Sequence, residues 1–186
     1  MENGALDLMR LKVVVIGLEN SGKTTLINKL SSATKNVEHS IDSGKTITLG
    51  FDIGKTELAG CSVHFFAAPG QRQFEFARKI VFRGAHIGIL MVDSVSSTDE
   101  SAGERQRDLE QELIGNNIPY FVCANKRDIP GVLALSEIQA HFSAPVYPVE
   151  LKTDSGVNAL RDVLASVIEV NKHSWLAASE KKLTCE

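Results

Sequence analysis

The sequence is poor in cysteine and has no long apolar run. Its 186 residues include only three cysteines, Cys61, Cys123 and Cys185, which form neither a C-x-x-C pair nor a zinc-ligand spacing. No stretch approaches 18 consecutive apolar residues, and the opening residues MENGALDLMR lack the layout of a signal peptide. These absences exclude a structural zinc site and a membrane-spanning helix, and we expect a reducing, cytoplasmic setting.

The sequence also lacks a strong excess of positive charge and the motifs that direct lipid attachment. The formal net charge is -3, which gives no sign of a nucleic-acid-binding surface, so we expect no nucleic-acid partner. The chain begins Met-Glu, which differs from the Met-Gly of a myristoylation motif, and Cys185 stands one residue before the end instead of four. We therefore expect no intrinsic membrane anchor. A monomer and a dimer are both compatible with the sequence.

The chain does contain a regular alternation of short apolar runs and longer amphipathic stretches. The apolar runs are rich in β-branched residues and cover 11–17, 61–67, 85–93, 118–124 and 144–149. Between them, apolar residues at three- and four-residue spacing predict helices over 22–30, 101–114, 135–142 and 157–170. This order predicts an α/β fold with βαβ units and a mostly parallel sheet.

One junction predicts an antiparallel strand in that sheet. Only Ala59 and Gly60 separate the strand pattern at 47–58 from the run at 61–67, which is too short for a helical crossover, so the two strands should form a hairpin. The chain length fits a single core. We predict an N-terminal extension at 1–10, one domain over 11–172 and a polar tail at 173–186.

The segment after the first predicted strand matches the phosphate-loop pattern G-x-x-x-x-G-K-[ST]. Its backbone N–H groups would curl around a β-phosphate, and the N-terminus of the next helix adds a positive dipole. Lys23 would reach the β- and γ-phosphates, and the Thr24 hydroxyl would bind magnesium. The predicted phosphate-binding residues are Gly17, Leu18, Glu19, Asn20, Ser21, Gly22, Lys23, Thr24 and Thr25.

A second motif selects the base. Asn125, Lys126 and Asp128 form an N-K-x-D sequence at the end of the run at 118–124. The Asp128 carboxylate can accept hydrogen bonds from guanine N1–H and N2–H, which adenine does not present in that arrangement, so GTP and GDP are the expected ligands. After the next strand, Leu151 and Lys152 are placed to contribute a backbone N–H and side-chain packing to the guanine.

Together these motifs resemble the Ras superfamily of small GTPases from about residue 12 to residue 170. The phosphate loop GLENSGKTT is close to the ADP-ribosylation-factor form, whereas TLGFDIG, APGQRQF and VFRGAHIGILMVDS resemble prokaryotic small GTPases, including the bacterial gliding-motility group. The resemblance implies a P-loop NTPase of three layers, with a six-stranded sheet and five helices. It also implies GTP hydrolysis to GDP and two mobile loops that read the γ-phosphate.

The resemblance assigns roles to three residues in those loops. Thr48 matches the first switch threonine, which adds its hydroxyl to magnesium and its backbone N–H to the γ-phosphate only in the GTP state. Gly70 and Gln71 match the second switch glycine and the catalytic glutamine. The glutamine orients the attacking water, because phosphoryl transfer needs positioning more than proton chemistry. Lys23 is the other residue predicted to act in catalysis.

The second switch departs from the family pattern D-x-x-G-Q, because Ala67 stands where the magnesium-linked aspartate belongs. Either magnesium binds more weakly or another acid replaces the aspartate. Asp52 is the first candidate, since the predicted hairpin would bring it beside the vacant position. Its alternative is a polar residue on an exposed strand face. Asp93, at the end of the run at 85–93, is a second candidate, although an aspartate there is usually structural in the resembled family.

Glu19 is the other departure, because it places an acid in the phosphate loop. A carboxylate near the γ-phosphate repels developing negative charge and crowds the space for an arginine finger, so we predict slow intrinsic hydrolysis. An arginine supplied by a partner, or Arg72 next to Gln71, could add the missing charge.

Three functions fit these observations, and the leading one is a GTP-hydrolysing molecular switch. Its partners would be effector, exchange and activating proteins, with Phe74 and Phe76 either forming part of an effector surface or packing under the loop. The second is a GTP-binding scaffold with little turnover, and Gln71 argues against it. The third is a phosphate-loop kinase, which N-K-x-D disfavours.

Overall fold

The computed structural model describes residues 8–42, 46–95 and 100–183, without the side chains of 36–42, 46–51, 72, 100 and 178–183. Its strands form one seven-stranded sheet in the order β2-β3-β4-β1-β5-β6-β7. In chain order they are β1 (Arg10–Gly17), β2 (Ala33–Asp42), β3 (Thr46–Leu58), β4 (Cys61–Ala67), β5 (Ile87–Asp93), β6 (Tyr120–Asn125) and β7 (Val146–Pro148).

The sheet is mixed, as predicted. β1 pairs parallel with β4 and β5, and the parallel set continues through β6 to β7. β3 runs against this set because it pairs antiparallel with β4 across the turn at Ala59 and Gly60, and it pairs antiparallel with β2 on its other side. The predicted hairpin and the one antiparallel strand are confirmed.

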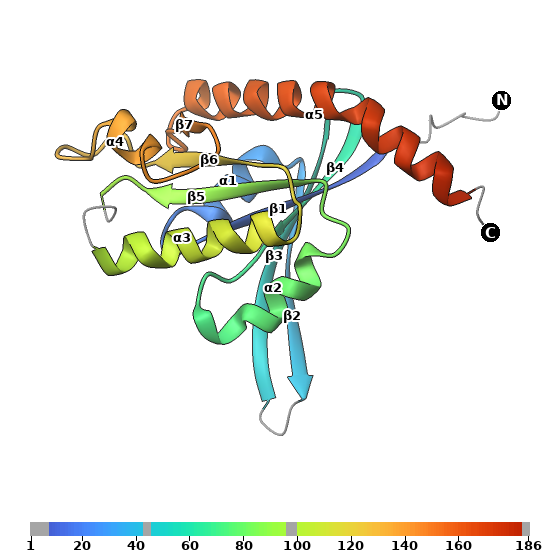
Figure 1. The fold of residues 1–186 in the computed structure, drawn as a ribbon, viewed down its shortest axis with the longest axis horizontal. Coiled ribbons are helices and arrows are strands. Elements are labelled where there is room, and N and C mark those ends of the chain that lie inside the picture. Colours follow the sequence, from blue (N-terminus) through green and yellow to red (C-terminus); the bar gives the residue numbers. More distant parts are fainter. Residues whose placement is uncertain (1–7, 43–45, 96–99, 184–186) are drawn as a thin grey trace.

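The strand count differs from the expected six because β2 was not predicted. Its sequence ATKNVEHSID mixes charged and polar residues and lacks the apolar run that identified the other strands. Pairing extends from Ala33 opposite Lys55 to Asp42 opposite Thr46, so the backbone ladder defines this strand where side-chain pattern does not. In Figure 1 the β2–β3 hairpin projects away from the body of the sheet.

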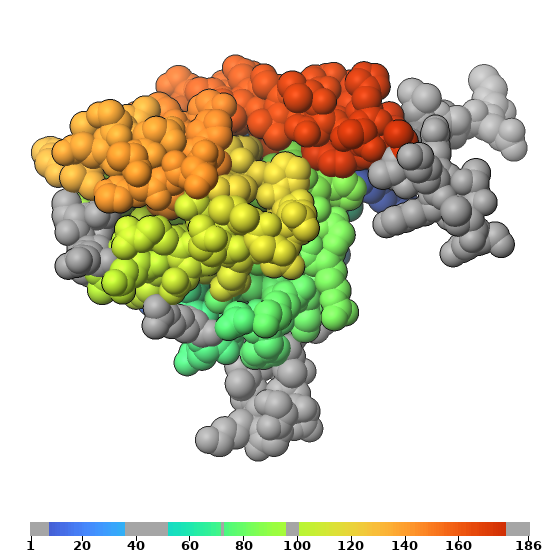
Figure 2. Space-filling view, in the orientation of Figure 1, coloured from blue at the N-terminus to red at the C-terminus, as the bar shows by residue number. Residues whose placement is uncertain are grey.

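Helices cover both faces of the sheet and give the three-layer arrangement. The helices are α1 (Lys23–Leu30), α2 (Glu75–Phe82), α3 (Glu100–Gly115), α4 (Leu135–Gln139) and α5 (Asp154–Leu183). Side chains from α1 and α5 pack in one half of the core, and those from α2, α3 and α4 pack in the other. Figure 1 shows α5 and α3 on opposite sides of the central strands, and in Figure 2 residues of α3, α4 and α5 form a continuous surface.

The central strands are apolar throughout because both of their faces are covered. In β1, Val13 and Val15 belong to the first half of the core, whereas Val14 and Ile16 belong to the second. A strand buried on both faces has no polar side to expose, which explains its continuous apolar run. Burying each such side chain contributes about 1.5–3 kcal/mol relative to leaving it exposed.

Two helices differ from their predicted ranges or were not predicted. α2 follows a short 3-10 turn at Arg72–Phe74 and was not predicted, because its eight residues lie in the segment interpreted as the second switch. α5 continues to Leu183, into the segment expected to be a polar tail. The partly buried Trp175 packs against the first half of the core and meets the His86 ring edge-on, with the centroids 5.5 Å apart. These contacts hold the helix beyond residue 173, and the domain boundaries at 10 and 172 stay predictions.

The topology brings the predicted functional segments to one edge of the sheet. The phosphate loop follows β1, the second switch follows β4, N-K-x-D ends β6, and Leu151 and Lys152 follow β7. Carboxyl ends of parallel strands lie at the same edge, which is where α/β sheets bind ligands. Within residues 8–42, 46–95 and 100–183, no helix has the length and apolar content needed to cross a membrane.

Candidate functional site

The phosphate loop connects β1 to α1 and closes around the Lys23 side chain. Lys23 Nζ donates hydrogen bonds to the carbonyl oxygens of Gly17 (2.9 Å) and Leu18 (2.7 Å). Burial lowers the pKa of this amine, and the negative charges of Glu19 and Asp52 oppose that shift. The Lys23 amine lies beside the N-terminus of α1. The positive charge of the amine and the dipole of the helix both favour binding of an anion there.

The phosphate loop is joined directly to the N-K-x-D segment predicted to bind the guanine base, which is called the base motif below. Asn125 Nδ2 donates a buried hydrogen bond of 3.0 Å to the carbonyl oxygen of Ser21. Gly22, which precedes α1, has a left-handed φ of 104°, and a Cβ atom there would lie 2.3 Å from the same Nδ2 atom. Glycine is needed at this position for both its conformation and its lack of a side chain.

A pocket of about 390 Å³ opens beside the phosphate loop. It brings together phosphate-loop residues and the lysine of N-K-x-D, which are about a hundred positions apart in the sequence. The lining residues are Asn20, Gly22, Lys23, Thr24, Thr25 and Lys126.

The base motif is held by two ion pairs. Lys126 Nζ lies 2.6 Å from a carboxylate oxygen of Asp93, and Lys152 Nζ lies 2.5 Å from a carboxylate oxygen of Asp128. The hydrogen bond from Lys152 holds the pKa of Asp128 below its ordinary value. Asp128 is thus an anion ready to accept hydrogen bonds, and the segments after β6 and β7 meet as the sequence predicted. Leu151 is buried in the first half of the core.

The second switch contacts the phosphate loop at two points. Gly70 lies so close to β1 that a Cβ atom would be 2.1 Å from the carbonyl oxygen of Gly17. Gln71 Nε2 donates a hydrogen bond to the Glu19 carboxylate, and Gln71 Oε1 accepts one of 2.8 Å from Gln73. The catalytic candidate Gln71 is therefore engaged by the unusual acid of the phosphate loop.

The position vacated by the family aspartate faces Asp52. Ala67 is buried at the end of β4, and the last registered pair of the β3–β4 ladder is Ile53 opposite Phe66. One step further along both strands come Asp52 and Ala67. The Asp52 carboxylate accepts a hydrogen bond from Thr24 Oγ1, the hydroxyl predicted to bind magnesium. The hairpin thus brings an acid to the place where one was expected.

The remaining candidates fall elsewhere or outside the described side chains. Asp93 pairs with Lys126 and accepts a 3.0 Å hydrogen bond from the backbone N–H of Val95, so its carboxylate supports the base motif. Thr48 lies in β3 opposite Ser40, and Arg72 begins the 3-10 turn, but their side chains are outside the described residues. In the part of the chain that the structure describes, no three His, Cys, Asp or Glu side chains cluster as a metal site.

Comparison with known protein families identifies the group to which this chain belongs. A model of the ADP-ribosylation factor family matches residues 3–172. The chain is a member of the ADP-ribosylation factor family. This confirms the predicted relationship to Ras-like small GTPases and makes the chain a small GTP-binding protein.

Relatives of this Arf-family protein occur in archaea and bacteria. It is 33% identical over 140 residues to the uncharacterized protein MJ1339 of Methanocaldococcus jannaschii, covering 75% of this chain and 84% of the relative. It is 29% identical over 163 residues to the mutual gliding-motility protein MglA of Myxococcus xanthus, covering 78% of this chain and 84% of MglA. It is 27% identical over 143 residues to ADP-ribosylation factor-like protein 6 of Caenorhabditis elegans, covering 74% of this chain and 71% of the relative. Both Arf-like and gliding-motility relatives were expected from the motifs.

The solved structures extend this agreement to the fold. The G domain of the T. maritima FeoB iron transporter superimposes with a TM-score of 0.63 at 23% identity, covering 82% of this chain and 95% of that domain. At this identity the likeness concerns the fold alone.

Sequence reasoning missed one pair of residues beside the site of this Arf-family protein. Arg78 on α2 is buried, and its guanidinium binds the Glu112 carboxylate on α3 and the backbone carbonyls of Pro69 and Gln71. No motif or spacing connects residues 78 and 112. A buried arginine on a short helix is visible only once the helices are packed together.

Proposed function

We propose that this protein hydrolyses GTP to GDP slowly and acts as a nucleotide-dependent switch that binds effectors. The observation that carries the proposal is the contact between the second switch and the phosphate loop, with Gln71 bonded to Glu19 and Gly70 packed against Gly17. A protein that only stored nucleotide would not need a glutamine at this place. The proposed setting is the cytoplasm, with exchange and activating proteins as regulators.

Nucleotide recognition divides between the two ends of the site. Backbone N–H groups of residues 17–25 and the Lys23 amine bind the phosphates, aided by the dipole of α1. The ionised Asp128 accepts two hydrogen bonds from guanine, while Lys126 and Lys152 pack beside the base. The bond from Asn125 to Ser21 fixes the distance between these two ends. Guanine specificity and phosphate binding therefore depend on one connected framework.

Slow hydrolysis follows from the position of Glu19. In the proposed reaction Gln71 orients a water molecule for attack on the γ-phosphate. The Glu19 carboxylate holds the Gln71 amide and adds negative charge near the phosphate loop. Both effects oppose the transition state, so an activating protein would have to displace Gln71 from Glu19 or supply positive charge. That charge is worth about 10³–10⁵ in rate when an arginine provides it.

Magnesium fits the oxygen atoms at the start of α1. Magnesium prefers hard oxygen ligands, and Thr24 Oγ1 and the Asp52 carboxylate already contact one another there. We assign Thr24 and Asp52 as the residues that would hold the ion, and Thr48, four residues before Asp52 in β3, would add its hydroxyl only in the GTP state. When bound, magnesium neutralises charge on the β- and γ-phosphates. Asp52 thereby takes the place of the aspartate missing at Ala67.

Single-turnover hydrolysis of bound GTP tests the proposal. Wild-type protein should release GDP and phosphate slowly at saturating magnesium, and Gln71→Leu should abolish release while retaining GTP binding. Gln111→Ala, which removes an exposed glutamine of α3, is the matched control and should hydrolyse as wild type does. Stable GTP in the wild-type protein would support the scaffold function, and transfer of phosphate to a third molecule would support a kinase.

A further inference from the structure

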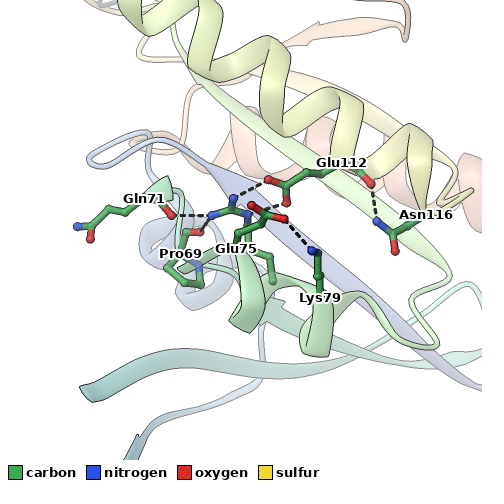
Figure 3. Close-up of polar contacts among 7 residues, drawn as sticks. Pro69, Gln71, Glu75, Lys79, Glu112 and Asn116 are labelled. Carbon is green, nitrogen blue, oxygen red and sulfur yellow. Dashed lines mark hydrogen bonds and ion pairs between the residues drawn. The ribbon is translucent and has the colours of Figure 1, made fainter. Parts of the chain in front are cut away.

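A buried arginine joins the second switch to α3. Arg78 Nε and Nη2 donate hydrogen bonds to the two Glu112 carboxylate oxygens at 2.7 Å and 2.5 Å. Arg78 Nη1 donates to the carbonyl oxygens of Pro69 at 3.0 Å and Gln71 at 2.7 Å. Figure 3 shows Pro69 and Gln71 on one side of this network and Glu112 on the other.

The bond to the Pro69 carbonyl fixes the orientation of the peptide group that ends in the Gly70 N–H, and the bond to the Gln71 carbonyl holds the peptide group after Gln71. A peptide group is planar and trans, so its N–H points opposite to its carbonyl oxygen. The Pro69 carbonyl is turned toward Arg78 and α3, and the N–H of Gly70, which shares that peptide group, therefore points the other way. The close approach of Gly70 to the Gly17 carbonyl places the phosphate loop nearby. Arg78 thus directs the Gly70 N–H away from α3. Gly70 lies in the second switch, one of the two loops that the family resemblance implies read the γ-phosphate, and this N–H is the group it offers for that contact.

The hydrogen bonds of Arg78 cross an open space between the second switch and α3. A cavity of about 420 Å³ lies at the junction, and Gly70, Arg78 and Glu112 are among its lining residues. Across this cavity the hydrogen bonds of Arg78 connect the second switch to α3. The forked guanidinium spans the cavity because its nitrogen atoms bind a carboxylate and two carbonyls at once, which the single amine of a lysine does not reproduce.

We propose that Arg78, held by Glu112, is a positioning residue of the GTPase site, which couples α3 to γ-phosphate reading by Gly70 and water orientation by Gln71. The inference rests on the proposed function. It assigns to α3 a part in the switch, because any partner that moves Glu112 would also move the peptide group before Gly70 and the peptide group after Gln71. Arg78 acts through the backbone and does not itself touch the nucleotide.

A double substitution separates positioning from stability. Arg78→Met with Glu112→Leu replaces the ion pair between the buried Arg78 and the partly exposed Glu112 by apolar side chains of similar size, so that neither charge is left without its partner. Lys79→Ala is the matched control, because it removes the exposed neighbouring ion pair between Lys79 and Glu75. If the double variant does not fold, the milder single variants Arg78→Lys and Glu112→Gln are measured in its place.

We expect single-turnover hydrolysis to fall about 10- to 100-fold in the double variant, because small misplacements of positioning groups cost that much. Affinity for a non-hydrolysable GTP analogue should fall about tenfold, because a charge-assisted hydrogen bond is lost, whereas GDP affinity should stay unchanged. Arg78→Lys should lie between wild type and the double variant. Lys79→Ala should match wild type in all three measurements.

Two other outcomes overturn the inference in distinguishable ways. If wild-type protein binds and hydrolyses GTP and all Arg78 and Glu112 variants do the same, or if GDP and GTP-analogue affinities fall equally, Arg78 is only structural. If wild-type protein fails to bind guanine nucleotide, the proposed function fails first and the inference fails with it.

Discussion

The base end and the γ-phosphate end of the site are built differently. At the base end, Asn125 and Asp128 have partners supplied by neighbouring loops, Ser21 and Lys152. At the γ-phosphate end, residues that depart from the family pattern contact the expected ones: Asp52 bonds to Thr24, and Glu19 bonds to Gln71. Under the proposed function, the base end binds guanine with the groups usual for the family. The other end has the hydroxyl and the glutamine that are usual for the family, but they are hydrogen-bonded to Asp52 and Glu19, which are not part of the family pattern.

This contrast separates recognition from switching. Guanine recognition needs a fixed constellation, and long-range bonds between loops provide it. Reading a γ-phosphate needs groups that change partner, and Gln71 and Thr24 both have acidic partners that nucleotide or an ion would displace. Substitutions at the base end should therefore change which nucleotide binds, whereas substitutions at the other end should change how fast it turns over.

The largest effect is expected for Asp128→Asn. An amide presents a donor where guanine needs an acceptor, so GTP affinity should fall by about 10³–10⁴, and xanthosine triphosphate should become the better ligand. Competition binding with both nucleotides measures the change. Asp162→Asn, an exposed acid on α5, is the control and should leave the preference for guanine intact. Equal loss for both nucleotides would contradict the assigned role.

Asp52→Ala tests the altered magnesium corner. Loss of this acid should raise the magnesium concentration needed for half-maximal GTP binding by about 10- to 100-fold, because supporting residues of metal sites contribute that much. Titration of magnesium against GTP affinity measures it. Ala67→Asp in the same chain should restore the requirement to near the wild-type value, since the acid returns to the opposite strand. Unchanged magnesium dependence in Asp52→Ala would remove the assignment.

Glu19→Gly should raise the rate of hydrolysis by about tenfold. The substitution releases the Gln71 amide and removes a negative charge that opposes the transition state, an effect of about 1.4 kcal/mol. Single-turnover measurements at saturating magnesium check it, and Glu137→Gln on α4 serves as a distant control. A slower or unchanged rate would show that Glu19 does not hold Gln71 back.

The smallest effect is expected for Asn125→Ala measured without nucleotide. Losing the buried bond to the Ser21 carbonyl should lower the free energy of unfolding by about 1 kcal/mol, or roughly fivefold in the equilibrium constant. Chemical denaturation measures this loss. Asn116→Ala removes an exposed amide that donates 2.7 Å to the Glu112 carbonyl, and it should cost less because water replaces the bond.

The sequence predicted the parts of the molecule whose side chains repeat or follow a motif. The buried strands had apolar runs because both faces are covered, and the two-residue turn at Ala59 and Gly60 allowed only a hairpin. That hairpin in turn made Asp52 the first candidate for an acid beside Ala67, ahead of Asp93. β2 was missed because its side chains are mostly polar and its existence depends on backbone pairing with β3.

Contacts between distant segments were not predictable from the sequence. Arg78 and Glu112 are 34 residues apart on helices whose relative position is set by core packing, and no spacing rule links them. The length of α5 depends on Trp175 meeting the core and His86, which a helical pattern ending near residue 170 does not reveal. The bond from Asn125 to Ser21 joins two recognised motifs, but neither motif specifies it.

The pairing of Asp52 with Ala67 has a consequence for how such proteins are found. Asp52 and Ala67 lie one step beyond the last registered pair of the β3–β4 ladder, so an aspartate at either position has its carboxylate in the same corner of the molecule. A search for the sequence pattern D-x-x-G-Q finds only that its aspartate is replaced by Ala67. A comparison of positions that are paired across the sheet finds the carboxylate on the neighbouring strand. Such a comparison would keep this chain as a candidate GTPase, whereas the linear pattern would reject it.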